Sequence, residues 1–550
     1  MTINISGARK VSEKISPDGY EATRRMQESQ ETTWLFEDIN GGRAAGNVYS
    51  TREKIAEAMG IEKDGIVRHV MDAMAAPVPP EEVKDPAFAQ CELPLDLEAL
   101  PIVKYFPEDA GRYISAGIVV SEYNGKRNVS FHRMLIRNKK EIGIRLVPRH
   151  TFTLFNEAKK DGKDLNIAIC IGAPVEAMVA AALSVDFGTD ELTIASAMHR
   201  NGHGTPLKVA KCRNGLTVPA DCEYVIEARI TSRTAPEGPF VDIAGTYDEI
   251  RDQPVVEVDC IRSKKDPVFQ LLLPGGFEHF LLMGVPREPV IFRTVRQAVP
   301  KVKNVRLTEG GCCWLNGVVS ISKNREGDGV NAIMAAFTGH PSMKNVIIVD
   351  DDIDIFDDRE VEWAVATRMQ ADRIIRIPGA GGSSLDPSAH GTTWKTGFDA
   401  TLPLGADRGP YTKATVPGKK RSVRRHPLGY TEPIPSERTR WFHIGKKTGR
   451  TAIITVNTTA IAITARGPTL IPFESSESKY LISPAEEEKP SFFSFATSPP
   501  IPPRYITFVR RSYGMLRPGG TVLRPPAVAS VSAVTRWRRV PFRPHRSIRS

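Results

Sequence analysis

The sequence has no apolar stretch near the roughly 20 residues that a membrane-spanning helix needs, so we expect no membrane segment. Its first twenty residues also lack the apolar centre of a secretory signal, which favours a cytoplasmic protein. None of the seven cysteines occurs in CxxC spacing, which argues against a structural zinc site and a disulfide framework. What remains is a chain of ordinary soluble composition, 41% hydrophobic and 25% charged, and 550 residues are enough for several domains.

Aspartate is absent from residues 421–550, which contain 22 lysines and arginines and only 7 glutamates. Residues 1–420 hold 52 basic and 57 acidic residues, so the net charge of +10 comes from the C-terminal part alone. One interpretation is a disordered basic arm that binds nucleic acid. The other is a wrong reading frame or read-through past a lost stop, and the missing aspartate favours it. We therefore assign this tail no function and do not expect nucleic acid as a partner.

Helical patterns stand near the N-terminus. Residues 24–39 are expected to form one helix and residues 50–61 a second, with Ser50 or Thr51 as the cap that accepts a backbone hydrogen bond. A proline-rich joint follows at residues 76–87.

Strand patterns dominate the middle of the chain. Between about residues 115 and 260, β-branched segments separated by turn residues predict a β-barrel or split sheet. Continuous apolar segments at 165–174 and 342–356, each followed by a helical segment, predict an α/β layer. The expected fold class is therefore α/β, with the β-rich region inserted into it.

Three polar side chains on different predicted elements form a candidate metal site. Asn128 lies in "NVSFHR", His150 ends "RLVPRH", and Glu191 enters a short predicted helix. Taken singly, each has an ordinary structural explanation. Together they offer oxygen and nitrogen donors, a set that suits a hard or borderline divalent ion such as Mn²⁺ better than a thiolate-seeking one.

A stiff corner, "TAPEGPFVDIAGTYD", carries two acids. Proline fixes one backbone dihedral and glycine frees its neighbour, so Glu237 and Asp242 stand on a shaped loop. Such loops often carry function, although two acids facing water would look the same. Arg133, five residues after Asn128, needs a twist or bulge in its strand if both are to face one pocket.

The order of these residues resembles the UbiD family of decarboxylases. The resemblance continues through "DPVFQLLLPGGFEHFLLMGVPREP", "LTEGGCCWLNGVVSI" and "SSLDPSAHGTTWKTGFDATLPLG", and it is collinear over roughly residues 45 to 418. Within the family, the sequence is most similar to the archaeal branch that acts on an anhydromevalonate phosphate. The resemblance implies an α/β domain, a split β-barrel of the flavin-reductase type and a C-terminal α/β portion. We place these at residues 1–100, 101–290 and 291–418, followed by the tail at 419–550.

The resemblance also implies roles for individual residues. Asn128, His150 and Glu191 match the ligands of a divalent metal, Mn²⁺ or Mg²⁺, which together with K⁺ binds the phosphate of prenylated FMN. Arg133, Glu237 and Asp242 match the catalytic network, and Arg133 also contacts the cofactor. Lys395, in "WKTGFDAT", matches a lysine that approaches the cofactor. Much of the family has glutamate where this chain has Asp242, so the shorter acid predicts a different substrate pocket.

The implied activity is non-oxidative decarboxylation of an α,β-unsaturated acid. In the archaeal mevalonate pathway this would convert trans-anhydromevalonate 5-phosphate to isopentenyl phosphate, through cycloaddition with prenylated FMN and with Asp242 as proton donor. Loss of CO₂ from an alkene carbon leaves a charge that no side chain can stabilise, so an electron-sink cofactor must take it up. The resemblance further implies a flavin prenyltransferase that supplies the cofactor and a homo-oligomer of two or more subunits.

Three questions stay open at this level. Another member of the family could act on an aromatic acid such as a prenylated 4-hydroxybenzoate. If the substrate is a phosphate monoester, Arg145, Arg149 and Lys303 are candidate contacts, and nothing selects among them. Glu278 and His279, in a glycine-rich stretch, either line the pocket or supply ordinary loop polarity.

Overall fold

The computed structural model describes residues 3–414 and four short segments, 453–457, 460–464, 470–472 and 480–482. The chain divides into two compact units, residues 1–433 and 434–550. All predicted site residues lie in the first unit. In the part that the structure describes, no helix has the length and apolar character of a membrane span.

The second unit is described only as two antiparallel strand pairs. These are β24 (Ile453–Asn457) with β25 (Ala460–Thr464), and β26 (Leu470–Pro472) with β27 (Tyr480–Ile482). The prediction of an unstructured or out-of-frame tail at 419–550 falls almost wholly outside the described residues.

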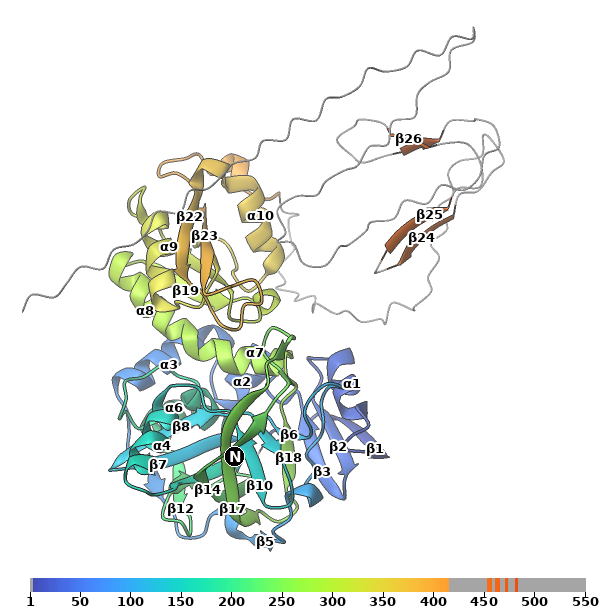
Figure 1. The fold of residues 1–550 in the computed structure, drawn as a ribbon. Helices are drawn as coiled ribbons and strands as arrows, with labels where there is room; N and C mark the ends of the chain where they lie inside the picture. Colours follow the sequence, from blue (N-terminus) through green and yellow to red (C-terminus); the bar gives the residue numbers. More distant parts are fainter. Residues whose placement is uncertain (1–2, 415–452, 458–459, 465–469, 473–479, 483–550) are drawn as a thin grey trace, which may run out of the picture. The chain divides into compact units, whose positions relative to one another are not determined.

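The first unit begins with a four-stranded sheet in the order β1-β2-β3-β18 (Figure 1). Its elements and the helices that follow are β1 (Arg9–Ile15), α1 (Glu21–Glu28), β2 (Trp34–Ile39), β3 (Gly42–Gly46), α2 (Arg52–Ala58), α3 (Ile66–Ala75) and the distant β18 (Val268–Leu271). Helix α2 confirms the second predicted helix: the Thr51 hydroxyl accepts a hydrogen bond from the Lys54 backbone N–H at 3.3 Å.

The first predicted helix is wrong beyond Glu28. The "WLFEDI" segment forms β2, which pairs with β1 in parallel and with β3 in antiparallel orientation. Trp34 and Phe36 enter one hydrophobic cluster, while Leu35 enters another. Alternate residues therefore bury opposite faces, which a strand between two packed layers achieves and a helix does not.

A nine-stranded sheet forms the middle of the unit, and its hydrogen-bonded path runs from β6 to β8 without closing. Its strands are β5 (Cys91–Leu93), β6 (Tyr113–Ile114), β7 (Ile118–Tyr123), β8 (Lys126–Phe131), β9 (Met134–Ile136), β10 (Glu141–Ile144), β11 (Leu165–Ile171), β14 (Tyr224–Glu237) and β17 (Arg251–Ser263). Three helices accompany it: α4 (His150–Lys160), α5 (Val175–Ala181) and α6 (Glu191–His203). Two small sheets complete the region, β4 (Glu81–Glu82) with β12 (Lys208–Lys211) and β13 (Thr217–Pro219), and β15 (Phe240–Val241) with β16 (Tyr247–Asp248). An open sheet in this region agrees with the predicted mixed α/β fold.

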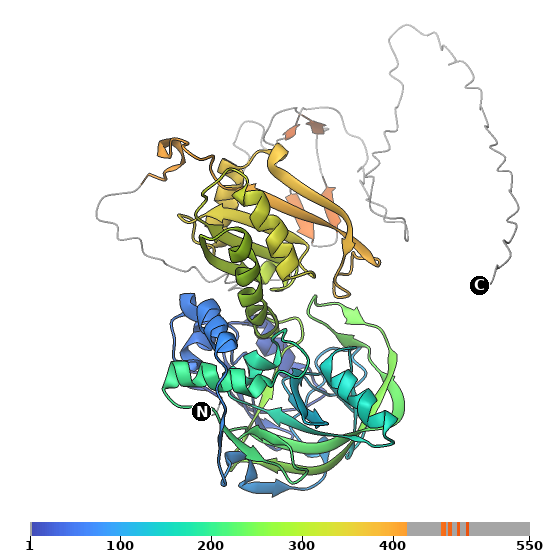
Figure 2. The same cartoon turned by 90° about the vertical axis from the view of Figure 1, so that its left-hand side faces the viewer.

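The C-terminal part of the first unit is a five-stranded sheet in the order β19-β20-β21-β23-β22 (Figure 1 and Figure 2). Its elements are α7 (Phe277–Gly284), α8 (Glu288–Ala298), β19 (Val302–Leu307), β20 (Asn316–Ile321), α9 (Asp328–Gly339), β21 (Asn345–Asp350), α10 (Asp358–Arg368), β22 (Ile374–Gly381) and β23 (Thr392–Ala400). Val319 and Ile348 pack in one cluster, and their neighbours Val318 and Val349 pack in another. Both faces are therefore buried, as is typical of parallel central strands such as β20, β21 and β23.

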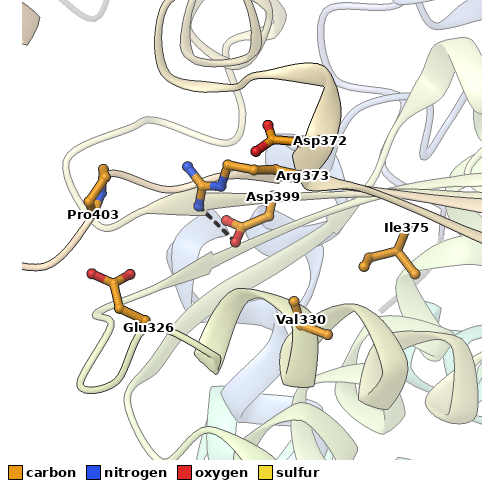
Figure 3. Close-up of a pocket in the computed structure, with 7 residues that line it drawn as sticks. All are labelled: Glu326, Val330, Asp372, Arg373, Ile375, Asp399 and Pro403. Carbon is orange, nitrogen blue, oxygen red and sulfur yellow. Dashed lines mark ion pairs between the residues drawn. The ribbon is translucent and has the colours of Figure 1, made fainter.

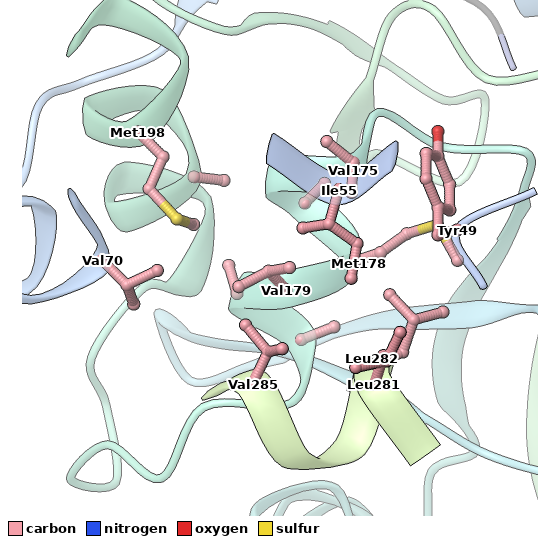
Figure 4. Close-up of a cluster of buried hydrophobic side chains, with 14 of the residues drawn as sticks. Tyr49, Ile55, Val70, Val175, Met178, Val179, Met198, Leu281, Leu282 and Val285 are labelled. Atoms are coloured by element: carbon pink, nitrogen blue, oxygen red, sulfur yellow. The ribbon is translucent and has the colours of Figure 1, made fainter. Parts of the chain in front are cut away.

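A shared core anchors α7 against helices from earlier in the chain. Leu281, Leu282 and Val285 pack with Met178 and Val179 of α5, as Figure 4 shows. Burial of such side chains contributes about 1.5–3 kcal/mol each. Helix α7 and the 3₁₀ turn η4 (Val285–Arg287) that follows it therefore have defined positions beside the central sheet.

Candidate active site

Arg133 lies at the centre of a buried ionic network. It stands in the break between β8 and β9, so the chain changes direction between Asn128 and Arg133, which meets the requirement for an irregularity. Its Nε and Nη2 atoms each donate to Glu237 at 2.9 Å, and the Tyr113 hydroxyl donates to the same carboxylate at 3.1 Å. The Glu237 side chain is fully buried at the end of β14. Paired donors fix both the position and the plane of the guanidinium.

Two further acids face Arg133 from the hairpin after Glu237. Its Nη1 lies 3.1 Å from Asp248 Oδ2 and 3.6 Å from Asp242 Oδ2. Asp242 holds its own turn, because its Oδ1 accepts the Ile243 N–H at 2.6 Å. The Asp242 side chain stays 27% exposed, whereas Glu237 is sealed from water. One guanidinium thus serves three carboxylates, and only one of them, Asp242, combines access to solvent with a weak ion pair.

Sequence reasoning missed Asp248, although it ends the stretch that carries the two predicted acids. Burial alone would raise the pKa of Asp248, but the hydrogen bond from Arg251 at 2.6 Å and the charge of Arg133 outweigh it and lower the pKa. Arg145 approaches the same carboxylate at 3.8 Å. The only available signal was its proximity in sequence to Asp242, which did not indicate that β15 and β16 pair.

His279 lies beside the predicted acid. Its Nδ1 accepts the Gly275 N–H at 3.1 Å, which leaves Nε2 to carry the proton of the neutral ring. Burial lowers the pKa of His279, while the charge of Asp242 acts in the opposite direction. The neighbouring Glu278 has a structural role, since its buried carboxylate accepts the N–H groups of Val48 and Tyr49. Of the two, only His279 lies toward the acids.

The three predicted metal ligands lie on connected segments. Glu191, the first residue of α6, accepts the Val129 N–H at 3.0 Å and so reaches the residue after Asn128. The Asn128 amide donates to Thr151 Oγ1 at 2.8 Å, the residue after His150. Strand β8, at the end of the sheet path, therefore has contacts to the start of α4 and to the start of α6. That the three side chains share one ion stays a prediction.

The chemistry of these side chains fits a divalent ion. The Asn128 nitrogen donates to Ser130 and Thr151, which leaves its oxygen as the available ligand atom. Burial, followed by the charge of Arg149, lowers the pKa of His150, which favours the neutral, metal-binding imidazole. Burial raises the pKa of Glu191 to about 8, and no lysine or arginine within the described residues forms an ion pair with it. A cation at this place would offset the cost of that buried carboxylate.

A second group of potential ligands lies elsewhere. Glu176, His199 and His203 have ligand atoms within 4.8 Å of one another. His203 Nε2 is 3.1 Å from Glu176 and 3.1 Å from the Ala58 carbonyl oxygen. These bonds join α5, α6 and the end of α2, so the cluster already has a structural role.

Lys395 lies on β23 and is engaged with backbone. Its ammonium donates to the carbonyl oxygens of Pro341 and Met343, the latter at 2.6 Å, and it lies 5.2 Å from the Phe337 ring centre. Burial lowers the pKa of Lys395. Among the described contacts, none joins it to Arg133 or to the metal ligands, so its approach to the cofactor stays a prediction.

A cavity of about 290 Å³ opens in the C-terminal part, and none of the predicted site residues lines it. Its lining comprises Glu326, Val330, Asp372, Arg373, Ile375, Asp399 and Pro403 (Figure 3). Arg373 and Asp399 form an ion pair at 2.8 Å, and Arg373 also donates to the Thr401 carbonyl oxygen. The only cation in its lining is therefore already paired.

Comparison with known proteins shows the family of this chain. Three family models match in succession: the N-terminal domain, the Rift-related domain and the C-terminal domain of 3-octaprenyl-4-hydroxybenzoate carboxy-lyase, at residues 8–74, 81–277 and 280–400. The chain belongs to the UbiD family of carboxy-lyases, which confirms the predicted family and enzyme class.

Several individual proteins of the family are similar to most of this chain. The anhydromevalonate phosphate decarboxylase of Methanocaldococcus jannaschii is 43% identical over 397 residues, covering 70% of this chain and 92% of the relative. The UbiD-class enzyme HmfF from Pelotomaculum thermopropionicum, solved in complex with FMN, is similar with a TM-score of 0.72 and 37% identity, over 75% of this chain and 95% of HmfF. An evolved dimeric form of HmfF, solved with prFMN, has a TM-score of 0.68 and 34% identity, over 75% and 94% of the two chains.

Proposed function

We propose that this protein decarboxylates trans-anhydromevalonate 5-phosphate to isopentenyl phosphate, with prenylated FMN as cofactor. The observation that carries the proposal is the Arg133 network: a buried Glu237 fixes the arginine, which faces the partly exposed Asp242. The relatives named for this reaction and the prFMN complex of HmfF support the substrate and the cofactor.

The residues would share the work as follows. Asn128, His150 and Glu191 would bind Mn²⁺ or Mg²⁺, which with K⁺ would hold the flavin phosphate, and Lys395 would approach the flavin. Prenylated FMN supplies an electron sink for the charge that departing CO₂ leaves behind. Arg133 would attract and orient the substrate carboxylate, since guanidinium groups match carboxylates in charge and shape.

Asp242 would complete the reaction by protonating the carbon that has lost CO₂. The bond from that carbon to the carboxyl carbon breaks, a new C–H bond forms, and Asp242 is left as a carboxylate. Because the Asp242 side chain is 27% exposed, water can return the proton after each turnover. Glu237 is a positioning residue, because it contacts Arg133 and Tyr113 and is sealed from solvent.

The proposal has further parts. The domain division at 1–100, 101–290 and 291–418, a cytoplasmic location, a homo-oligomeric assembly and cofactor supply by a flavin prenyltransferase all belong to it. The dimeric form of HmfF and the three successive family matches support the assembly and the division.

The deciding experiment compares two acids. The protein is co-expressed with a flavin prenyltransferase, its bound cofactor is identified by mass spectrometry, and CO₂ release is measured from anhydromevalonate phosphate and from a prenylated 4-hydroxybenzoate. We expect prenylated FMN and turnover of the first acid only. Turnover of the aromatic acid alone would transfer the assignment to the other branch of the family.

The metal site has its own test. Glu191→Gln keeps the size of the side chain but removes the charge that a divalent ion needs. We expect the purified variant to lose metal and flavin together, by at least about tenfold. Glu176→Gln, in the separate cluster on α5, is the matched control and should keep both. A full complement of metal and flavin in Glu191→Gln would contradict the ligand assignment.

A further inference from the structure

Arg287 has no acidic partner in the described part of the chain. It ends the turn η4 between α7 and α8, and its Nε is buried with no hydrogen-bond acceptor. Within the described residues it forms no ion pair, although the next residue, Glu288, is buried and pairs with Arg52. Its guanidinium lies 5.3 Å from the centre of the Trp314 ring. An unsatisfied buried donor on a charged group is costly unless something else accepts from it.

The charge of a second arginine, Arg149, acts on Arg287. Burial, followed by the positive charge of Arg149, lowers the pKa of Arg287 to about 10. Arg149 precedes α4 and is exposed, and no ion pair joins it to an acid in the described part of the chain. The positive charges of Arg149 and Arg287 repel each other, so an anion bound by both would convert repulsion into attraction.

The other candidates for an anion contact are already occupied or remote. Arg145 approaches Asp248 at 3.8 Å, and Lys303 is 54% exposed and 4.0 Å from Asp351. The paired cations are neutralised within the protein, whereas Arg149 and Arg287 are not.

The surroundings of Arg287 hold it in a set orientation. The Trp314 indole beneath it donates to Ser383 Oγ at 3.0 Å, and the His340 ring packs edge-on against that indole with centroids 4.5 Å apart. His340 Nε2 is 3.0 Å from the Trp314 carbonyl oxygen. Burial and the charge of Arg287 lower the pKa of His340 to about 4, so this ring is neutral and does not compete for an anion. A guanidinium stacked on a fixed indole is well placed to bind an oxyanion.

The segment formed by α7 and η4 carries both Arg287 and His279, the residue beside Asp242. His279, beside Asp242, and Arg287 are eight residues apart along α7 and η4, which is about 12 Å at the helical rise. A short molecule with an acid at one end and a phosphate at the other has dimensions of this order.

We propose that Arg287 and Arg149 form the subsite for the terminal phosphate of the substrate and so select a phosphorylated acid. This inference rests on the proposed function and deepens it, because it says which residues distinguish the phosphorylated acid from its dephosphorylated counterpart. Arg287 donates to the phosphate oxygens from the turn η4, and Arg149 closes the site from the start of α4.

The test uses the flavin-loaded enzyme and Arg287→Met, which keeps an apolar side chain of similar length. For the phosphorylated acid we expect KM to rise by about 30-fold or more, the usual result of removing one partner of a desolvated charge pair, with kcat changed less than threefold. For the dephosphorylated acid, kcat/KM should be the same in both proteins. Arg287→Lys should recover part of the loss, because a point charge replaces the planar donor pair.

The control and a binding measurement separate this idea from the proposed function. Arg293→Met removes an exposed arginine from α8 and should leave KM unchanged. Inorganic phosphate should bind the wild-type protein, measured by calorimetry, and should bind Arg287→Met at least about tenfold more weakly. If the wild type does not turn over the phosphorylated acid, the proposed function fails while this binding difference still decides the subsite. Equal phosphate binding, an unchanged KM, or loss of flavin from Arg287→Met would overturn the proposal, the last because the arginines would then hold the phosphate of the cofactor.

Discussion

Two arginines of this protein are placed in opposite ways. Arg133 contacts Glu237 and faces Asp242 and Asp248, and although burial opposes it, the hydrogen bond and charge of Glu237 raise its pKa. Arg287 has no acid partner among the described residues, and burial lowers its pKa to about 10. The positive charge of Arg133 is therefore balanced by carboxylates of the protein itself, and one of these, Asp242, is the proposed proton donor. Arg287 lacks such a partner among the described residues, so its charge is available to a bound anion.

The largest effect should come from the paired region. Asp242→Asn keeps the shape of the acid but removes the proton that the product needs. We expect kcat to fall by about 10²–10⁴-fold, the usual contribution of a general acid, with cofactor retained. The free energy of unfolding should change by less than about 1 kcal/mol, because the ion pair with Arg133 is long and partly exposed.

CO₂ release and urea unfolding measure these two quantities for Asp242→Asn. Asp252→Asn, an exposed residue on β17, is the matched control. A kcat close to that of the wild type would remove Asp242 from the role of acid.

An intermediate effect on the free energy of unfolding distinguishes Arg52, which pairs with a buried acid, from Arg287, which does not. Arg52→Met leaves Glu288 buried without its cation, and removal of one partner from such a pair costs about 3–5 kcal/mol. Arg287→Met removes an unpaired cation, so its unfolding free energy without phosphate should stay within about 1 kcal/mol of the wild type. Urea unfolding of both variants makes the comparison. Equal destabilisation would mean that Arg287 supports the fold, and the contrast with Arg52 would disappear.

The smallest expected effect is a pH dependence of stability that comes from Asp109. Asp109 is buried and accepts the N–H groups of Phe106 and Val241, and burial raises its pKa from 3.8 to about 6. The folded protein therefore binds this proton more tightly than the unfolded chain, and the contribution to stability is complete below about pH 4. It is lost as the pH rises to about 6, by about 3 kcal/mol at most.

Urea unfolding at pH 4.5 and 6.5 can measure this contribution. Asp109→Asn should flatten the difference between the two pH values, since asparagine does not titrate there. An equally steep dependence in the variant would assign the effect to another group.

The candidate site was partly readable in the sequence. Asn128, His150 and Glu191 were expected to meet, and the contacts of Val129 and Thr151 place their segments side by side. The distant residues could be matched because their order along the chain resembles that of a known family. Asp248 was missed because its approach to Arg133 depends on a strand pair of two residues each, which no periodicity shows.

The errors in the fold have a similar cause. Residues 34–39 were predicted as part of a helix, because a short apolar segment fits the helical and the strand periodicity equally well. Pairing with β1 and β3 decided for a strand. The sequence does not indicate a binding role for Arg287, because an arginine in "VPREP" has the pattern of an ordinary helix surface residue.

The amino-acid sequence by itself determined the family and the order of the three matched domains, and it supplied the candidate site residues, since these depend on which side chains occur and in what order. Only the tertiary structure decided which charges have partners. Glu288 pairs with Arg52, 236 residues away, and not with the adjacent Arg287. The free energy of a charge depends on the groups and the water around it, and folding, not sequence neighbourhood, sets those surroundings.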